Sequence, residues 1–184
     1  MAALTIITAA TVTETLATGQ IAPTSNITIG GGGRLNMVNL AGVSETLASL
    51  TFLEGASGTA LASGLDRTAA QATSIVTLTA ATPITSTNSN PSTGVPFIGA
   101  NTGILAFSNA GGATLNVTSG LYGAGNSPAV GLRISAAIGS IPTLAEGGLI
   151  KSGNGLLVLD SATNFNQTPA SYNGSVASLT RSEE

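Results

Sequence analysis

Few side chains in this sequence could take part in chemistry. Of 184 residues, eight are Asp or Glu, five are Lys or Arg, and none is His or Cys. The lack of histidine excludes the commonest general base, the Ser-His-Asp arrangement and histidine metal sites. The lack of cysteine excludes disulfides and thiolate metal sites. What remains is carboxylate chemistry, which enzymes acting on polysaccharides perform with paired carboxylates, or with a carboxylate beside Lys or Arg.

The carboxylates that could form such a site are Asp66 beside Arg67, Glu54, Glu146 with Lys151, and Asp160. Adjacent residues of an extended chain face opposite ways, so the Asp66–Arg67 pair in GLDRT predicts a solvated turn instead of a catalytic pair. Glu146 and Lys151 are expected to pair at the surface, where an ion pair contributes about 0 to 1 kcal/mol. The sequence therefore assigns no catalytic residue, and we expect a protein that is not an enzyme. An enzyme acting on polysaccharides, whose carboxylates converge only in three dimensions, is the alternative from another class.

Other ligand classes find little support. The basic residues are scattered singly, which does not favour nucleic acid. The glycine-rich GGGGRLNMV and GLYGAGNSP lack the spacing of a phosphate-binding loop, and SGNGLLVLD places leucines where a calcium-binding repeat needs Asp. We therefore expect no cofactor and no metal. The threonine-rich TIIT, TVTET and TLT keep no common period, so the sequence does not predict a regular threonine face that could order water.

The elements that must position these residues are short strands. Charged residues make up only 7% of the chain, strong helix formers are rare, and apolar residues recur at every second position. About a dozen strands are predicted, at residues 4–8, 11–16, 26–29, 34–38, 48–53, 74–79, 104–108, 114–118, 131–135, 149–152, 156–159 and 175–179. Turn clusters separate them at residues 30–33, 109–112 and 152–155, and residues 82–96 are predicted to form an exposed loop.

Many short strands with glycine-rich turns fit either a sandwich or barrel, or a solenoid. Aromatic residues are only 3% of the chain and tryptophan is absent, whereas a sandwich core is anchored by large aromatics. The composition therefore favours an all-β solenoid in one domain, residues 1–184. We expect N-terminal coils at 1–81, the exposed loop at 82–96, middle coils at 97–146, repeat-like coils at 147–176 and a charged tail at 177–184.

The stretch GGLIKSGNGLLVLDSATNFNQTPASYNG meters out glycine and leucine regularly, and residues 147–176 resemble the autotransporter-associated β-strand repeat, also called the passenger-associated transport repeat. The matching residues are Gly148, Leu149, Lys151, Gly153, Gly155, Leu157, Leu159, Phe165, Gly174, Ser175 and Val176. The sequence departs from the repeat at Gln167 and Thr168, which replace a glycine pair, and at residues 169–171. Both Gly153 and Gly155 are suited to a turn with positive φ.

The resemblance implies a right-handed parallel β-helix in a secreted bacterial protein, where such repeats form a stalk and help it fold outside the cell. We therefore expect a structural segment at the cell surface or outside the cell, with a role in extension, display or adhesion. A subunit of an extracellular filament is the alternative. The N-terminal MAALTIITAATVTETL has no basic region typical of a signal peptide, is apolar and β-prone, and carries no charge before Glu14. We expect this strand to dock onto further coils of a parent protein or onto identical copies of the chain, with no membrane-spanning segment.

Overall fold

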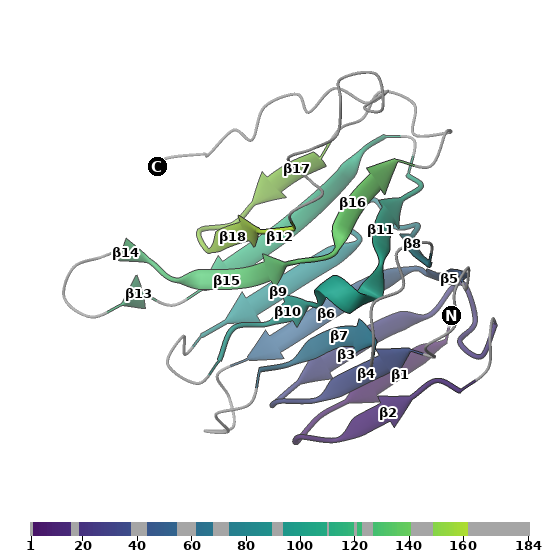
Figure 1. Ribbon diagram of the computed structural model, residues 1–184. Coiled ribbons are helices and arrows are strands. Elements are labelled where there is room, and N and C mark those ends of the chain that lie inside the picture. Colours follow the sequence, from purple (N-terminus) through teal and green to yellow (C-terminus); the bar gives the residue numbers. More distant parts are fainter. Residues whose placement is uncertain are drawn as a thin grey trace.

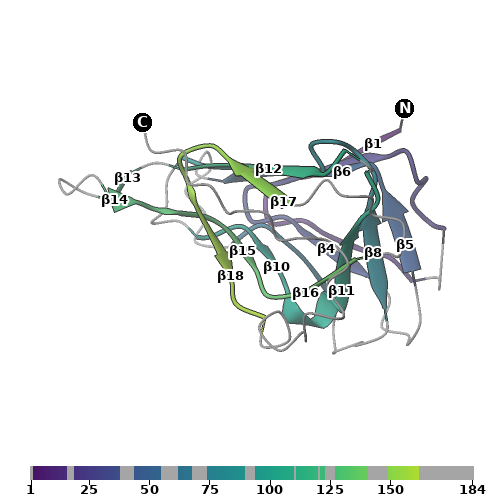
Figure 2. The ribbon, with the colours of Figure 1, turned by 90° about the horizontal axis from the view of Figure 1, so that it is seen from above.

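The chain forms a parallel β-solenoid, which confirms the predicted all-β solenoid fold (Figure 1). The structure is a computed structural model that describes residues 2–15, 19–37, 44–54, 62–67, 74–89, 94–109, 111–119, 121–122, 127–140 and 149–161. Within these ranges, the strands of three sheets pair in parallel, and each sheet runs along the stack of coils. Seen from above, the three sheets form the sides of a roughly triangular cross-section (Figure 2).

The three sheets are named A, B and C here. Sheet A contains, in spatial order, β1 (Ala3–Ile6), β3 (Asn26–Gly30), β6 (Ser49–Glu54), β9 (Ile84–Asn88), β12 (Ala113–Ser119) and β17 (Leu149–Ser152). Sheet B contains β2 (Thr11–Thr13), β4 (Arg34–Met37), β7 (Gly64–Arg67), β10 (Phe97–Ile98), β15 (Val130–Ile134) and β18 (Leu156–Leu159). Sheet C contains β5 (Ser44–Leu47), β8 (Ile75–Leu78), β11 (Ile104–Phe107) and β16 (Ala137–Ser140). A 3₁₀ turn, η1 (Ala100–Thr102), precedes β11, and β13 (Leu121–Tyr122) pairs with β14 (Ser127–Pro128) as an antiparallel hairpin.

Successive coils contain different numbers of residues although their strands stay in register. Ala3 pairs with Asn26 and Asn26 with Ser49, so the first two steps are both 23 residues long. The next step runs from Leu50 to Ile84, which is 34 residues. The additional residues lie between strands, because the pairing within each sheet continues without interruption. The repeat of this fold is therefore one strand spacing, and its length in residues varies.

The core is built from columns of inward-facing aliphatic side chains. In sheet A one column contains Leu4, Ile27, Leu50, Ile84 and Leu115, and in sheet B one contains Val12, Leu35, Leu65, Ile98 and Ile134. Most of these side chains are completely buried. Burying one Leu or Ile contributes about 1.5 to 3 kcal/mol, and branched side chains of similar size stack in register across parallel strands. The two-residue periodicity of the sequence is thus the alternation between core and surface.

Several turns depend on glycine. Gly31 and Gly32, between β3 and β4, have φ of 56° and 79°, and Gly153, between β17 and β18, has φ of 81°, as predicted for turns at these clusters. In the first coil the equivalent turn contains Thr8 and Ala9, which have φ of 60° and 58° and store strain of about 1 to 2 kcal/mol each. The left-handed turn is therefore kept where the sequence offers no glycine.

Gly155 differs from Gly153, because it is not among the residues with positive φ. A Cβ at Gly155 would lie 2.8 Å from the carbonyl carbon of Thr118 in the neighbouring coil. The expectation that both glycines have positive φ is therefore wrong for Gly155, which is needed for close approach between coils instead.

Every strand predicted within the described residues is present, but several others were missed. The exposed loop predicted for residues 82–96 is wrong in its first part, because Ile84–Asn88 forms β9, with Ile84, Ser86 and Asn88 facing the interior. The buried polar groups have partners: Ser86 Oγ donates to Gly131 O at 2.6 Å, and Asn88 Nδ2 donates to Gly94 O and Val130 O, both at 3.0 Å. The predicted strand at 175–179, the charged tail and residues 162–176 of the repeat lie outside the described residues.

Candidate functional site

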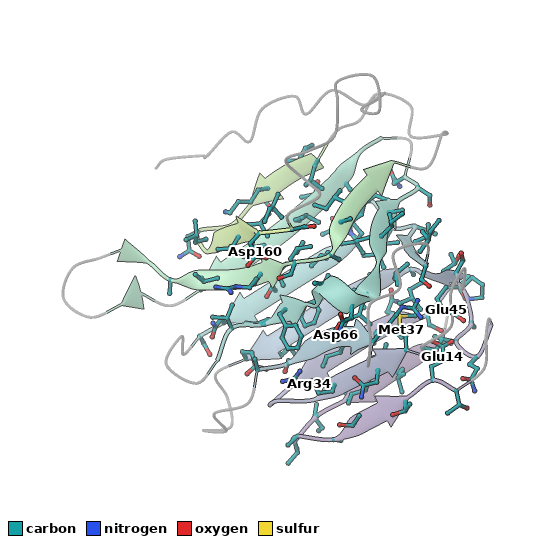
Figure 3. The ribbon with its side chains drawn as sticks, in the orientation of Figure 1. Glu14, Arg34, Met37, Glu45, Asp66 and Asp160 are labelled. Carbon is teal, nitrogen blue, oxygen red and sulfur yellow. The ribbon has the colours of Figure 1, made fainter. Side chains whose placement is uncertain are left out.

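The outer face of sheet B gathers most of the outward-facing charge in the described residues. The pairing register places Arg34, Gly64, Phe97 and Arg133 in one column of this sheet, with Asp66 in the column beside it. Asp160 follows β18, and its N–H donates to Ile134 O at 3.2 Å. Figure 3 shows Arg34, Asp66 and Asp160 on this side of the solenoid. We call Arg34, Asp66, Phe97, Arg133 and Asp160 the sheet B face.

Two glycines allow the side chains of this face to lie flat. A Cβ at Gly64 would lie 2.2 Å from Cε1 of Phe97, so the phenyl ring occupies the space above this glycine. The Arg34 guanidinium lies 4.5 Å from the centre of the same ring, a cation–π contact that contributes about 0.5 to 1 kcal/mol at an exposed site. A Cβ at Gly99 would lie 2.1 Å from Cγ of Asp66. Each large side chain thus fills the space left by a glycine in the adjacent coil.

The charges of the sheet B face also satisfy one another. Arg133 Nη1 lies 3.4 Å from Asp160 Oδ2, and Ser135 Oγ donates to Asp160 Oδ1 at 2.6 Å. Burial raises the pKa of Asp66, while the backbone N–H of Arg67 and the charge of Arg34 oppose the rise. These contacts link neighbouring coils on the outside of the stack.

The two carboxylates of this face are too far apart to act together on a glycosidic bond. Asp66 lies on β7 and Asp160 directly follows β18, and β10 and β15 separate these strands in the sheet. Three strand spacings correspond to about 14 Å. Glycosidases hold their two carboxyl groups about 5 to 9.5 Å apart. The sheet B face therefore does not bring Asp66 and Asp160 together as a catalytic pair.

A second group of charges lies inside the solenoid. The side chains of Glu14, Glu45 and Arg67 are only 2 to 3% exposed. They come from three successive coils, and Figure 3 shows Glu14 and Glu45 near Met37 at the N-terminal end of the stack. The backbone contributes partners, since Gly19 N–H donates to Glu45 Oε1 at 2.6 Å and Arg67 Nε donates to Thr102 O at 3.2 Å. We call Glu14, Glu45 and Arg67 the interior acid cluster.

The interior acid cluster holds a proton at neutral pH. Burial raises the pKa of Glu14 to about 8, the neighbouring Glu45 adds to the rise, and Arg67 opposes it. Neither carboxyl oxygen of Glu14 accepts a hydrogen bond from the described residues, which is tolerable only for the neutral acid. Burial lowers the pKa of Arg67, and both glutamates counteract this. Because solvent and substrates cannot reach these groups, they can alter stability with pH but are not placed to act on a ligand.

Glu54 is a buried structural acceptor. Its Oε1 accepts hydrogen bonds from the backbone N–H of Ser63 at 2.9 Å and of Gly32 at 3.3 Å, and from the Ser63 hydroxyl. The carboxylate thus connects the end of β6 to the turn between β3 and β4 and to the segment before β7. This candidate from the sequence holds a corner of the solenoid together.

The remaining sequence candidates are also accounted for. The solvated turn expected at Asp66 and Arg67 is wrong, because both residues belong to β7. Their side chains do face opposite ways, Asp66 outward and Arg67 into the core, as expected for an extended chain. Lys151 Nζ donates to Gly153 O at 2.6 Å, and its predicted partner Glu146 lies outside the described residues.

The outer face of sheet A contains a threonine column that the sequence did not reveal. Thr5, Thr28, Thr51 and Thr85 pair in register on four consecutive strands. The coils differ in length, so these residues have no common period along the chain. Only the strand pairing aligns them. The useful signal in the sequence would have been a threonine at the same position within each strand.

Within the ranges that the structure describes, no group of three or more His, Cys, Asp or Glu residues could hold a metal ion. A search of the same residues finds no helix with the length and apolar character needed to cross a membrane. Comparison of the chain with protein-family models, curated proteins and solved structures gave no match. The resemblance of residues 147–176 to the autotransporter-associated repeat therefore stays a prediction from the residues themselves.

Proposed function

We propose that this chain is a non-enzymatic structural segment of a secreted or surface-displayed bacterial protein, with a role in extension, display or adhesion. Three features support the proposal. The coils stack in register, the outward charges pair or pack with one another, and the interior carboxylates are sealed from substrates. The resemblance of residues 147–176 to a repeat found in stalks of secreted proteins agrees with it.

The observation that carries the proposal is the pair of edge strands at the N-terminal end. β1 is the terminal strand of sheet A and β2 the terminal strand of sheet B. Edge strands offer backbone N–H and C=O groups to which another strand can pair. The occupant of this edge is a further coil, either of a parent protein or of an identical copy. In a solenoid each coil contacts only its neighbours, so such additions extend the stack without altering it.

A lysine placed in the edge strand tests this assignment. Thr5→Lys puts a charge on the outward face of β1, and Lys is a common natural protection against edge pairing. Thr51→Lys is the matched control, because Thr51 occupies the same column on β6, which already has strands on both sides. We expect light scattering to show association of the wild-type chain that Thr5→Lys suppresses and Thr51→Lys does not. A wild-type chain that stays monomeric at high concentration would refute docking through this edge.

Ile6 is not suitable for this test, although it lies in the same strand. The side chain of Ile6 is 1% exposed and faces the core, so a lysine there would disrupt the first coil. Thr5 faces outward and avoids this problem.

The alternative functions differ from the proposal in what they predict. A filament subunit would use the same edge, but electron microscopy of the purified chain would then show long fibres instead of short particles. An enzyme would turn over plant or bacterial polysaccharides, and Asp66→Asn or Asp160→Asn would abolish the turnover. We expect no cleavage, because these two carboxylates are separated by three strand spacings, about 14 Å.

A further inference from the structure

We propose that the outer face of sheet A binds the surface of ice. The face is centred on the threonine column of Thr5, Thr28, Thr51 and Thr85. This inference is independent of the structural role proposed above, because it concerns the side of the stack and not its ends.

The column presents the same two groups at each step. Each threonine offers one hydroxyl and one methyl, and successive strands of a sheet repeat about every 4.8 Å. This repeat is close to the spacing of oxygen atoms on the surfaces of hexagonal ice. The column continues with two other polar, uncharged residues, Asn116 and Ser152. Water held over such an array is ordered along one direction by the sheet itself.

The hydroxyls of the column are available to water. In the described part of the chain, Thr5, Thr28, Thr51 and Thr85 make no side-chain hydrogen bond. In the adjacent column, by contrast, Thr118 Oγ1 donates to Thr87 Oγ1 at 3.3 Å. A hydroxyl that has no partner in the protein can both donate to and accept from surface water.

The charge distribution favours a neutral partner. The outward-facing positions of β1, β3, β6, β9 and β12 are uncharged, whereas sheet B bears the Arg34, Asp66, Arg133 and Asp160 side chains. Leu53 adds an apolar side chain that is 45% exposed. A face without charge does not hold counterions or strongly oriented hydration shells, which would oppose the order of an ice lattice.

The size of the face argues against a protein as the partner. Five strands of about five residues cover roughly 400 Å², from the strand spacing and the rise per residue. A stable protein interface needs about 800 Å² from each partner. The face is also without Trp or Tyr, the side chains that most often anchor protein interfaces. An extended regular lattice makes no such demand, because recognition depends on matching the repeat.

The test compares two threonines in equivalent settings. Thr51→Tyr raises a bulky ring from the middle of the column. Thr77→Tyr makes the same change at an outward position of β8 in sheet C, between Thr46 and Ala106. The assays are inhibition of ice recrystallisation and thermal hysteresis, with far-ultraviolet circular dichroism to verify that each variant is folded. We expect the wild-type chain and Thr77→Tyr to be active in both assays and Thr51→Tyr to lose activity.

A second variant protects the test against misfolding. Thr51→Val keeps the shape of the side chain and removes only the hydroxyl, so we expect a folded protein with weakened ice activity. The proposal is overturned if the wild-type chain is inactive in both assays, or if Thr77→Tyr loses as much activity as Thr51→Tyr. Binding to crystalline cellulose or chitin without ice activity would also overturn it, since the partner would then be a polysaccharide.

Discussion

Replacing Glu14 with glutamine tests the interior acid cluster directly. The pKa of Glu14 is raised from 4.5 to about 8, mainly because burial disfavours the charged carboxylate. The folded protein therefore holds this proton more tightly than the unfolded chain does. The resulting contribution to stability is complete below about pH 4.5 and is lost as the pH rises to about 8. At 1.36 kcal/mol per pKa unit, the whole effect amounts to about 5 kcal/mol.

Urea unfolding at a series of pH values between about 5 and 9 measures this effect. We expect the wild-type free energy of unfolding to fall by up to about 1.4 kcal/mol per pH unit from this group. Glu14→Gln removes the titrating group, so its profile is expected to be flatter and to lie above that of the wild type at pH 9. Glu45→Gln removes the neighbouring carboxylate and is expected to shift the steep part of the wild-type profile to lower pH.

The refuting result is equally specific. If the difference in stability between the wild type and Glu14→Gln is the same at pH 5 and pH 9, then Glu14 does not titrate differently in the folded and unfolded states. The assignment of a buried proton to this residue would then be wrong, whatever the size of the constant difference.

Three further changes test the backbone and the sheet B face. Gly153→Val is expected to lower the unfolding temperature clearly, because a β-branched residue is strongly disfavoured at φ of 81°; unchanged thermal unfolding would contradict the turn assignment. Ala9→Gly, which restores the glycine found at the equivalent Gly32, is expected to stabilise the protein by up to about 1 kcal/mol in urea unfolding, and a loss of stability would count against strain there. Arg34→Ala is expected to cost about 0.5 to 1 kcal/mol through its contact with Phe97; Arg34→Lys, which keeps the charge, should recover part of it if the cation–π contact is responsible.

The fold class could be predicted because its signal is local. Strands such as Asn26–Gly30 and Leu156–Leu159 have continuous aliphatic or β-branched patterns with glycine-rich turns nearby. The missed strands lack that pattern. β7 includes Asp66 and Arg67, and β9 is mostly Ser, Thr and Asn. They are strands because neighbouring coils supply the pairing, a tertiary effect that overrides weak intrinsic preference.

The candidate sites were less accessible to prediction. The partners of Arg34 and Asp66 are set by which residues stand above and below them, and that depends on coil lengths that the sequence does not state. The same limit hid the threonine column, whose members Thr51 and Thr85 are 34 positions apart while Thr28 and Thr51 are 23 apart. The interior position of Glu14 was also unpredictable, since an isolated carboxylate in an apolar segment usually marks an exposed position.

The unequal coils separate the reach of this molecule from its girth. A coil adds one strand spacing, about 4.8 Å, to the height of the stack regardless of how many residues it contains. The coil that starts with β12 also includes the β13–β14 hairpin, and 36 residues separate Leu115 from its partner Lys151 in the next coil. Insertions of this kind widen the sides and leave the height unchanged. A parent protein that must span about 100 Å would need about twenty such coils, whatever loops they bear, while each loop is free to change independently of its neighbours.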